Sequence, residues 1–491
     1  MKKVKVKSST ERIVIDNFGQ ISIDDKRVFP YEYCSQIYNF NNNNKVIEKG
    51  LGIGKLKLPS SNSLPFEEIE IDTSALTANS LSKVMHFKQY FLNEDSTVHR
   101  LLLYADDKKL YLHQMFENSN NFNWLYELSF ECEPVVLAYK KNGLDSILIS
   151  AEDKLVVWTT NSLPYELTNV PIITSMCIYD DVLYCTIKGE SHKIWYTADL
   201  NPETIGVESS TTKYVSLSDE RGACRKIIAF KENLYVFRDY GISRISTYTK
   251  DTPTYNQVYL SDSKIYANTV VVCGDVVIFM TRDGLYKFNG TTVSKIQSIP
   301  TKLIADINDY AVATNMQDKY YLALKLDFKD NNQILCEQQA DYKNNALIVI
   351  DLQNYNFEIL RGVDIKNMLA LKADSVEKIV VTFNSKDKDK LGEITNDGKY
   401  FEQELYKFYS SNYLVEQDMV GCTIKKFVID ASAKVNIKLI SDQTSVNFTT
   451  YTDGINEFQT IIPCKKFKFE ISSNQNNPTI RHIELEYVKR K

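Results

Sequence analysis

The chain has 491 residues, of which 43% are hydrophobic and 25% are charged, and its formal net charge is −5. This balance disfavours a general nucleic-acid-binding surface, and eleven prolines are few for a disordered chain. The length corresponds to two to four domains, or to one repeat array with an accessory domain. Tyr (31) and Phe (23) are abundant, which favours strands over helices.

The N-terminus carries the one basic cluster, "MKKVKVKSSTER" (Met1–Arg12). We interpret it as a solvated terminus or a first strand, in preference to a phosphate-binding arm. Its lysines lead into polar residues, so we expect no signal peptide there. No apolar stretch approaches the roughly 20 residues of a membrane helix. We therefore expect synthesis in a cytoplasm, no membrane partner, and departure only within a larger particle.

Residues 1–80 look irregular, with an Asn-rich stretch (Asn39–Asn44) and a Pro/Ser segment (Leu58–Pro65). "GLGIG" (Gly50–Gly54) lacks the spacing of a nucleotide-binding loop, and we interpret it as a flexible loop. Apolar residues that a partner could bury are interspersed with the polar run: Ile37, Phe40, Leu51, Ile53 and Leu56. We predict that the segment is an assembly arm, and that a chain without residues 1–60 folds to a monomer of unchanged thermal stability.

Residues 81–415 repeat one pattern, an apolar strand, a tight polar turn and a second strand. Clear copies begin at Leu101, Ile147, Leu183, Leu234 and Val277, and weaker ones at Tyr320 and Ile379. Successive starts are 46, 36, 51, 43, 43 and 59 residues apart. A period of about 40–50 residues built only of strands is typical of a β-propeller, in which four-stranded blades pack around an axis.

The fourth copy shows all four strands of a blade, because Lys226–Phe230 precedes its hairpin and Asn256–Asp262 follows it. We predict about seven blades, with six or eight as alternatives. The sixth copy contains a polar insertion, Asp327–Asn345, which we predict to be a second assembly surface. The alternative architecture, two or more β-sandwiches, predicts no regular period. The best helix candidate is one short segment, Thr301–Ala313.

Residues 420–491 alternate between apolar and polar residues, with turns at "TDG" and "SSNQNNP". Six strands are expected there: Ile424–Ser432, Lys434–Ser441, Ser445–Thr452, Glu457–Pro463, Lys465–Ser472 and Ile480–Lys489. Six strands in about 70 residues predict a small antiparallel β-sandwich. The fold class is therefore all-β, a propeller followed by a C-terminal sandwich.

The nine cysteines are an odd number and form no CxxC pair, so we predict neither a disulfide framework nor a zinc site. Most should be small buried residues. The five histidines are His86, His99, His113, His192 and His482, and no HExxH occurs. His99 and His113 could face each other across a hairpin, but a metal site needs further ligands. We interpret the histidines as exposed strand residues and predict no metal or cofactor.

Paired carboxylates occur at Asp106–Asp107, Asp180–Asp181 and Asp219–Glu220. A glycosidase requires two carboxyl groups about 5–10 Å apart in a cleft. We place these pairs in turns, where Asp hydrogen-bonds its own backbone. No GxSxG or Cys/His signature of nucleophilic catalysis is present. We predict no catalytic residue and no enzyme, although residues in an axial funnel would escape this reasoning.

Two phrases, Ile227–Ser246 ("IIAFKENLYVFRDYGISRIS") and Asp283–Ile296 ("DGLYKFNGTTVSKI"), resemble lines found in propeller-type structural proteins of tailed bacteriophages. These are the tail-hub, nozzle and stabilisation proteins. Ser35–Leu56 is similar to an opening segment of such chains, and the tail from Lys425 is similar to the small β-domain that ends many of them. The resemblance spans most of the chain but includes no catalytic motif, so it implies a class and a role only.

The resemblance implies a non-enzymatic virion component, assembled in the host cytoplasm, that docks to other virion proteins at the neck or tail. Copies would close by cyclic symmetry into a homo-oligomeric ring around the DNA path, close to DNA without specific binding. Two alternatives stay open. One is a host-surface receptor-binding propeller that recognises glycans through exposed aromatic residues, and the other, less favoured, is a glycan-degrading propeller enzyme.

Overall fold

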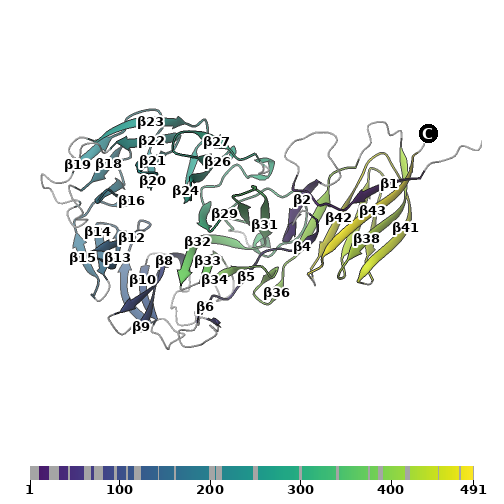
Figure 1. Ribbon diagram of the computed structural model, residues 1–491, viewed down its shortest axis with the longest axis horizontal. Coiled ribbons are helices and arrows are strands. Elements are labelled where there is room, and N and C mark those ends of the chain that lie inside the picture. Colours follow the sequence, from purple (N-terminus) through teal and green to yellow (C-terminus); the bar gives the residue numbers. More distant parts are fainter. Residues whose placement is uncertain are drawn as a thin grey trace, which may run out of the picture.

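A computed structural model gives the architecture of most of the chain. It describes residues 10–21, 33–42, 45–59, 68–70, 81–92, 97–106, 109–115, 123–141, 143–159, 162–197, 205, 213–246, 253–297, 301–338, 342–373, 376–384, 391–414, 421–451, 453–474 and 477–489. Figure 1 shows two lobes, a ring of sheets and a sandwich beside it.

Six four-stranded antiparallel sheets follow one another along the chain, and we name them blades 1 to 6. Blades 1 and 2 comprise β8 (Leu81–Leu92), β9 (Thr97–Asp106), β10 (Lys109–Met115), β11 (Asn123–Ser129), β12 (Val135–Lys141), β13 (Leu144–Ala151), β14 (Lys154–Thr159) and β15 (Tyr165–Thr168). Blades 3 and 4 comprise β16 (Ile173–Tyr179), β17 (Val182–Ile187), β18 (Lys193–Tyr196), β19 (Lys213–Ser216), β20 (Cys224–Phe230), β21 (Asn233–Arg238), β22 (Gly241–Ser246) and β23 (Thr254–Leu260). Blades 5 and 6 comprise β24 (Ile265–Cys273), β25 (Val276–Thr281), β26 (Gly284–Phe288), β27 (Val293–Lys295), β28 (Val312–Met316), β29 (Lys319–Leu324), β30 (Ala346–Asp351) and β31 (Phe357–Arg361).

Each repeated hairpin in the sequence forms the two middle strands of one blade. The fourth copy, for example, is β21 and β22, flanked by β20 and β23 as predicted. The first strand of each blade packs against the first strands of its neighbours, and β32 (Asp364–Ala373) of the last blade packs against β8 of the first. The first strands therefore surround the axis, and the predicted propeller of about seven blades is confirmed over the described residues.

Blade 7 is built from both halves of the chain. Its strands β32, β33 (Val376–Asn384) and β34 (Leu391–Thr395) are continued by β5 (Gly52–Gly54), and then by β35 (Lys399–Tyr400) and β36 (Gln403–Glu404). In antiparallel register, Ile53 pairs with Ile394. The interpretation of Gly50–Gly54 as a flexible loop is therefore wrong, because Gly52–Gly54 form the fourth strand of blade 7.

The second lobe is a sandwich of two sheets beside blade 6, where β2 (Cys34–Tyr38) and β3 (Phe40–Asn42) contact β31 (Figure 1). The six predicted tail strands are present as β38 (Cys422–Ala431), β39 (Asn436–Ser441), β40 (Ser445–Thr449), β41 (Gly454–Cys464), β42 (Phe467–Ser473) and β43 (Ile480–Lys489). Five further strands join them: β1 (Thr10–Ile15), β2, β3, β4 (Ile47–Lys49) and β37 (Lys407–Ser411). β1 pairs with β43 over its whole length, and β2 pairs with β37.

The boundaries expected from the sequence are corrected by these pairings. The described part of residues 1–80 is largely stranded, including a hairpin of β6 (Lys57–Pro59) and β7 (Glu68–Glu70). It supplies β5 to the sheet of blade 7 and β1–β4 to the two sheets of the sandwich. A short strand with apolar residues at alternate positions can bury them by pairing with a strand that is distant in the sequence as well as with one that is close. Ile13, Phe40 and Ile53 accordingly lie in the core.

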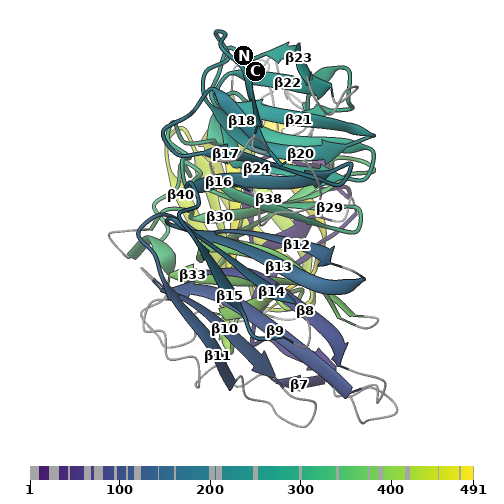
Figure 2. The ribbon, with the colours of Figure 1, turned by 90° about the vertical axis from the view of Figure 1, so that its left-hand side faces the viewer.

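Apolar clusters fill the spaces between neighbouring blades, as between blades 4 and 5, where Phe237 and Phe279 meet edge to face with centroids 5.4 Å apart. The largest cluster runs without a break from the interface of blades 5 and 6 into the sandwich, where it includes Phe427 and Phe469. Figure 2 views the propeller with the sandwich behind it. The predicted helix Thr301–Ala313 is reduced to a 3-10 turn, η2 (Thr301–Leu303), because the chain enters β28 at Val312.

Candidate functional site

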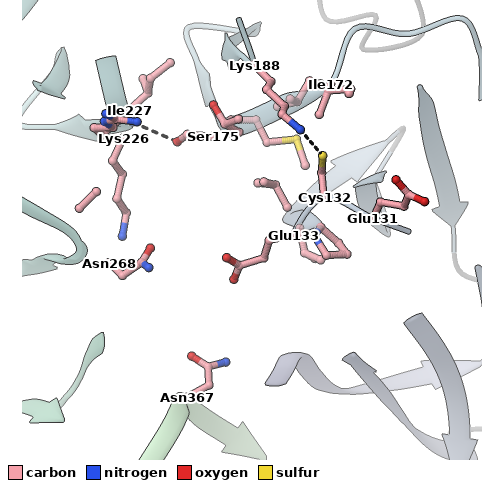
Figure 3. A pocket seen from close by; sticks show the side chains of 18 of the residues that line it. Glu131, Cys132, Glu133, Ile172, Ser175, Lys188, Lys226, Ile227, Asn268 and Asn367 are labelled. Atoms are coloured by element: carbon pink, nitrogen blue, oxygen red, sulfur yellow. Dashed lines mark hydrogen bonds between the residues drawn. The ribbon is translucent and has the colours of Figure 1, made fainter. Parts of the chain in front are cut away.

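A cavity of about 700 Å³ opens at one mouth of the propeller axis. Its lining comes from the first strands of five blades, β12, β16, β20, β24 and β32, from residues 131–134 before β12, and from the turn after β17. Figure 3 shows Glu133, from the connection between blades 1 and 2, and Lys226, Asn268 and Asn367, from blades 4, 5 and 7, directed into this axial cavity. A site assembled from several blades is a usual place for ligands in ring-like folds, because no blade alone encloses space.

β-bulges shape this mouth. The register shifts between Ile173 and Ser175 in β16, and between Cys224 and Lys226 in β20. β32 is interrupted in the same way between Ile365 and Asn367, and β24 has a longer break between Tyr266 and Val271. A bulge leaves one residue out of the ladder and turns its side chain. Thr174 and Arg225 are such residues, and both line the cavity.

The charges around the axial cavity are mixed, and most are held by protein partners. Arg225 forms a two-pronged ion pair with Asp239, with N···O distances of 2.7 and 3.1 Å. Lys226 Nζ donates to the carbonyl of Val270 at 2.8 Å. Lys188 Nζ lies 2.7 Å from Cys132 Sγ. The cavity therefore presents a polar, nearly balanced surface, without a concentration of one sign of charge.

Glu131 and Glu133 are the two carboxylates of the axial cavity, so they bear on catalysis. In Figure 3, Glu133 points into the cavity while Glu131 points away from it. The neighbouring Glu152 is occupied with the backbone, because it accepts hydrogen bonds from the amides of Cys132 and Glu131, which lower its pKa. The two carboxylates therefore do not converge. Their place at the axis could not be predicted from the sequence.

The histidines are distributed over both lobes. Backbone register pairs His99 with Tyr90 and His113 with Leu102, so these two histidines are not opposite each other. His192 lies in the turn between β17 and β18, and His482 Nδ1 lies 2.5 Å from Asp16 on the sandwich. Within the part of the chain that the structure describes, no group of three or more His, Cys, Asp or Glu residues is arranged to hold a metal ion.

The carboxylate pairs differ from one another. Asp180 and Asp181 form the β16–β17 turn with φ angles of 46° and 60°, as the turn interpretation predicted. Asp106 ends β9, while Asp107 lies outside the described residues. Asp219 is different, because it lies in the connection between blades 3 and 4 with only 7% of its side chain exposed. Asp219 nevertheless accepts a hydrogen bond from the amide of Arg221, two residues further on, at 3.0 Å. The turn interpretation therefore holds for Asp219, which in addition takes part in a buried ion pair.

Asp219 accepts a hydrogen bond from the fully buried guanidinium of Arg238. Arg238 also donates to the carbonyls of Leu217 (3.1 Å) and Gly222 (2.6 Å). Burial acts to raise the pKa of Asp219, but the amide of Arg221 and the charge of Arg238 outweigh it and lower that pKa. This ion pair fixes the connection between two blades, and no local sequence pattern marked Arg238.

Seven of the nine cysteines are buried, in agreement with their interpretation as small apolar residues. Cys422 and Cys464 are opposite each other on β38 and β41, and their sulfurs are 3.3 Å apart. Burial raises the pKa of Cys177 to about 11 and that of Cys34 to about 12. These thiols are therefore protonated at neutral pH and unsuited to nucleophilic attack.

The sandwich ends in an open sheet edge. β41 is 11 residues long and pairs on one side with β38, while its other side has no partner among the described strands. Ile455 and Ile461 on β41 are 68% and 76% exposed, and Tyr451, just before it, is 86% exposed. Figure 1 shows β41 at the end of the sandwich far from the propeller. Unpaired backbone groups beside apolar side chains favour pairing with another chain.

No protein-family model matches the chain, and no curated protein matches it. Solved structures resemble it at low similarity. The N-terminal domain of Nup159 matches with a TM-score of 0.39 and 9% identity, covering 70% of this chain and 95% of that one. Hsv2 of Kluyveromyces lactis gives 0.34 and 8% over 64% and 93%, and the AfRom2 CNH domain gives 0.36 and 11% over 64% and 97%. The assignment of the fold rests on the sheet topology described above.

Proposed function

We propose that the chain is a non-enzymatic structural component of a tailed-phage virion, which docks at the neck or tail and forms, with further copies, a ring around the DNA path. The phage-like phrases are the strands of blade 4 (β20–β22) and blade 5 (β26–β27), parts of the rigid disc. The N-terminal segment supplies strands to both lobes: β5 to blade 7 of the disc, and β1–β4 to the sandwich. A rigid two-lobed protein is better suited to transmitting force between neighbouring virion proteins than to opening and closing around a substrate.

The single observation that carries the proposal is the open edge at β41. Such an edge is unfavourable for an isolated protein, since it invites pairing with any exposed strand. The bulge near Lys426 and the proline at 463 interrupt only its C-terminal half. Gly454–Gln459 keeps a regular register with β38. A neighbouring virion chain would add a strand there and cover Tyr451 and Ile455.

The solution mass of the purified chain tests this proposal, measured by light scattering during gel filtration. We expect multimers of the wild-type chain and monomers of Ile455→Lys/Ile461→Lys, because charges at the edge oppose pairing. Leu144→Lys/Leu163→Lys is the matched control, with exposed leucines on the propeller, and it should stay multimeric. A wild-type chain that remains monomeric at its highest soluble concentration would contradict the proposal.

A second candidate, a glycan-binding propeller, is favoured by one surface. Tyr240, Leu260, Ile307 and Tyr310 are 42–70% exposed. Tyr240 lies in the β21–β22 turn, Leu260 ends β23, and Ile307 and Tyr310 lie between blades 5 and 6. Ser261 N donates to the carbonyl of Tyr240, and Lys264 pairs with Asp309. Exposed aromatic rings can stack on sugars as well as on proteins. Binding to a panel of host surface glycans, lost in Tyr240→Ala/Tyr310→Ala, would favour this candidate over the virion ring.

A further inference from the structure

A second cavity, of about 460 Å³, lies where the propeller meets the sandwich, and we call it the junction cavity. From the propeller it is lined by η2 and by residues 329–332 of the blade 6 insertion. From the sandwich it is lined by β2, β37, β39 and β42. Its size is within the range of small-molecule sites, which commonly lie between domains.

Four of the side chains around the junction cavity are lysines: Lys302, Lys329, Lys438 and Lys468. Only two are carboxylates, Asp330 and Glu470, and both are already neutralised. Asp330 pairs with Arg361 Nη1 at 2.8 Å, and Glu470 pairs with Lys468 at 2.7 Å. The positive charge of the cavity is therefore in excess.

Lys329 and Lys438 carry most of this excess. Each is exposed, and no salt bridge of either is found among the described residues. Lys438 lies opposite Glu470 in the register of β39 and β42, but Glu470 pairs with Lys468. They approach from opposite lobes, Lys329 from the insertion and Lys438 from β39. Two ammonium groups facing one space repel each other, and an anion between them relieves that repulsion.

The cavity also offers neutral groups that can bind oxygen atoms. Tyr413, which is 46% exposed, and the amide of Asn331 line it. Asn412 lines it as well, and its amide donates to the carbonyl of Tyr33 at 3.2 Å. Lys466 and Lys468 lie 4.8 and 6.0 Å from the ring of Tyr413, so the ring is held between cations. Ammonium, amide and hydroxyl donors around one anion are the usual composition of a phosphate site.

Buried interactions hold the propeller side of the cavity in place. Arg361, whose side chain is 4% exposed, pairs with Asp330 and Glu337 of the insertion. Gln36 on β2 donates to Asp330 as well. Lys329 adjoins this fixed carboxylate, so its main chain is already ordered before any ligand arrives. Pre-organisation of this kind lowers the entropy cost of binding.

We propose that the junction cavity binds a small molecule with two or more phosphate groups, which bridges Lys329 and Lys438 and so links the propeller to the sandwich. The enclosed position between two lobes favours a small ligand over a nucleic-acid duplex. This inference is independent of the proposed virion role, because it rests on residues away from β41.

Calorimetric titration of the full chain with inorganic tripolyphosphate at constant ionic strength tests this inference. We expect saturable binding of one ligand per chain and a rise in the thermal unfolding midpoint. Lys329→Ala/Lys438→Ala should weaken binding at least tenfold. Lys140→Ala/Lys434→Ala removes two exposed lysines, one from each lobe, that do not line the cavity, and it should bind like the wild type.

Three results would overturn the inference. The first is no saturable binding by the wild-type chain. The second is equal weakening in both double variants, which would indicate non-specific attraction. The third is binding of citrate as tight as that of tripolyphosphate, which would contradict the assignment to phosphate. Since Lys329 and Lys438 are exposed, folding of the variant is expected, and the single variant Lys302→Ala gives a second, independent test with a smaller loss of affinity.

Discussion

Arg238 has no exposed surface, yet it carries a charge in the connection between blades 3 and 4. Its guanidinium satisfies Asp219 and two backbone carbonyls at once. Removal of Arg238 would leave the buried Asp219 with only the longer, 3.6 Å ion pair to Arg221, and loss of one partner of a buried ion pair is costly. We expect Arg238→Met to lower the free energy of unfolding by about 3–5 kcal/mol in urea titrations. Arg225→Met, at a side chain that is 51% exposed, should change it by less than about 1 kcal/mol.

The pH dependence of this loss identifies its cause. The folded-state pKa of Asp219 is lowered, so the ion pair stabilises the fold above the unfolded-state pKa and ceases to do so as pH falls through the lowered value. The difference between wild type and Arg238→Met should therefore be largest near neutral pH and shrink below pH 4. A difference that stays constant down to the acid limit would mean that lost packing, and not the lost charge pair, is responsible.

Cys422 and Cys464 give a second prediction at the residue scale. Their sulfurs are 3.3 Å apart at the ends of two paired strands, within reach of a cross-strand disulfide after a small shift. Because both thiols are buried, oxidation is slow. Hydrogen peroxide would oxidise one thiol to a sulfenic acid with loss of water, and the second thiol would displace a further water. We expect peptide mapping to find this link and no other. Cross-linking of Cys185 at the same rate would contradict the expectation.

β5 is the element on which ring closure depends. A Cβ atom on Gly52 would lie 2.4 Å from the carbonyl oxygen of Lys399 and 2.3 Å from Asp397 Oδ1. Gly52→Val should therefore lower the free energy of unfolding by about 3 kcal/mol and speed hydrogen exchange in β34. Gly54→Ala, whose Cβ would meet only the Thr395 side chain at 3.0 Å, is the milder control. Unchanged exchange in β34 of Gly52→Val would show that β5 does not hold blade 7.

The N-terminal segment is where the structure differs most from the prediction made from sequence, because the expected detachable arm is part of both lobes. A deletion of residues 1–60 removes β1–β6 and thus strands of four sheets. We now expect a large drop in the thermal midpoint, or insoluble protein, where the sequence pattern predicted no change. A truncated chain that unfolds at the wild-type temperature would restore the earlier interpretation of a detachable arm.

The elements that sequence analysis predicted correctly are local ones. A blade hairpin such as β21–β22 is predicted by two apolar runs and a polar turn that all lie within 15 residues. β5 has three residues, two of them glycine, and pairs with a strand more than 300 positions away. Nothing in its own composition distinguishes it from a loop. The role of Asn39 could not be predicted for the same reason. This buried residue hydrogen-bonds to the main chain of Arg361, which is more than 300 positions away.

On the scale of the whole molecule, the two lobes are one body because the chain passes between them repeatedly. The insertion Asp327–Asn345, expected as an assembly surface, packs in its described part against Arg361 and borders the junction cavity. Its role in assembly stays a prediction. The axial cavity and the junction cavity could not be predicted from the sequence, since each is assembled from residues of several sheets.

The most direct test of the virion role is a cryo-electron microscopy reconstruction of tailed particles produced with the gene for this chain. The account predicts a ring of copies at the neck or tail around the DNA path, each with a closed propeller and with β41 paired to a neighbouring chain. Purified, infectious particles that lack the chain, or that carry it as isolated copies with β41 facing solvent, would contradict the account.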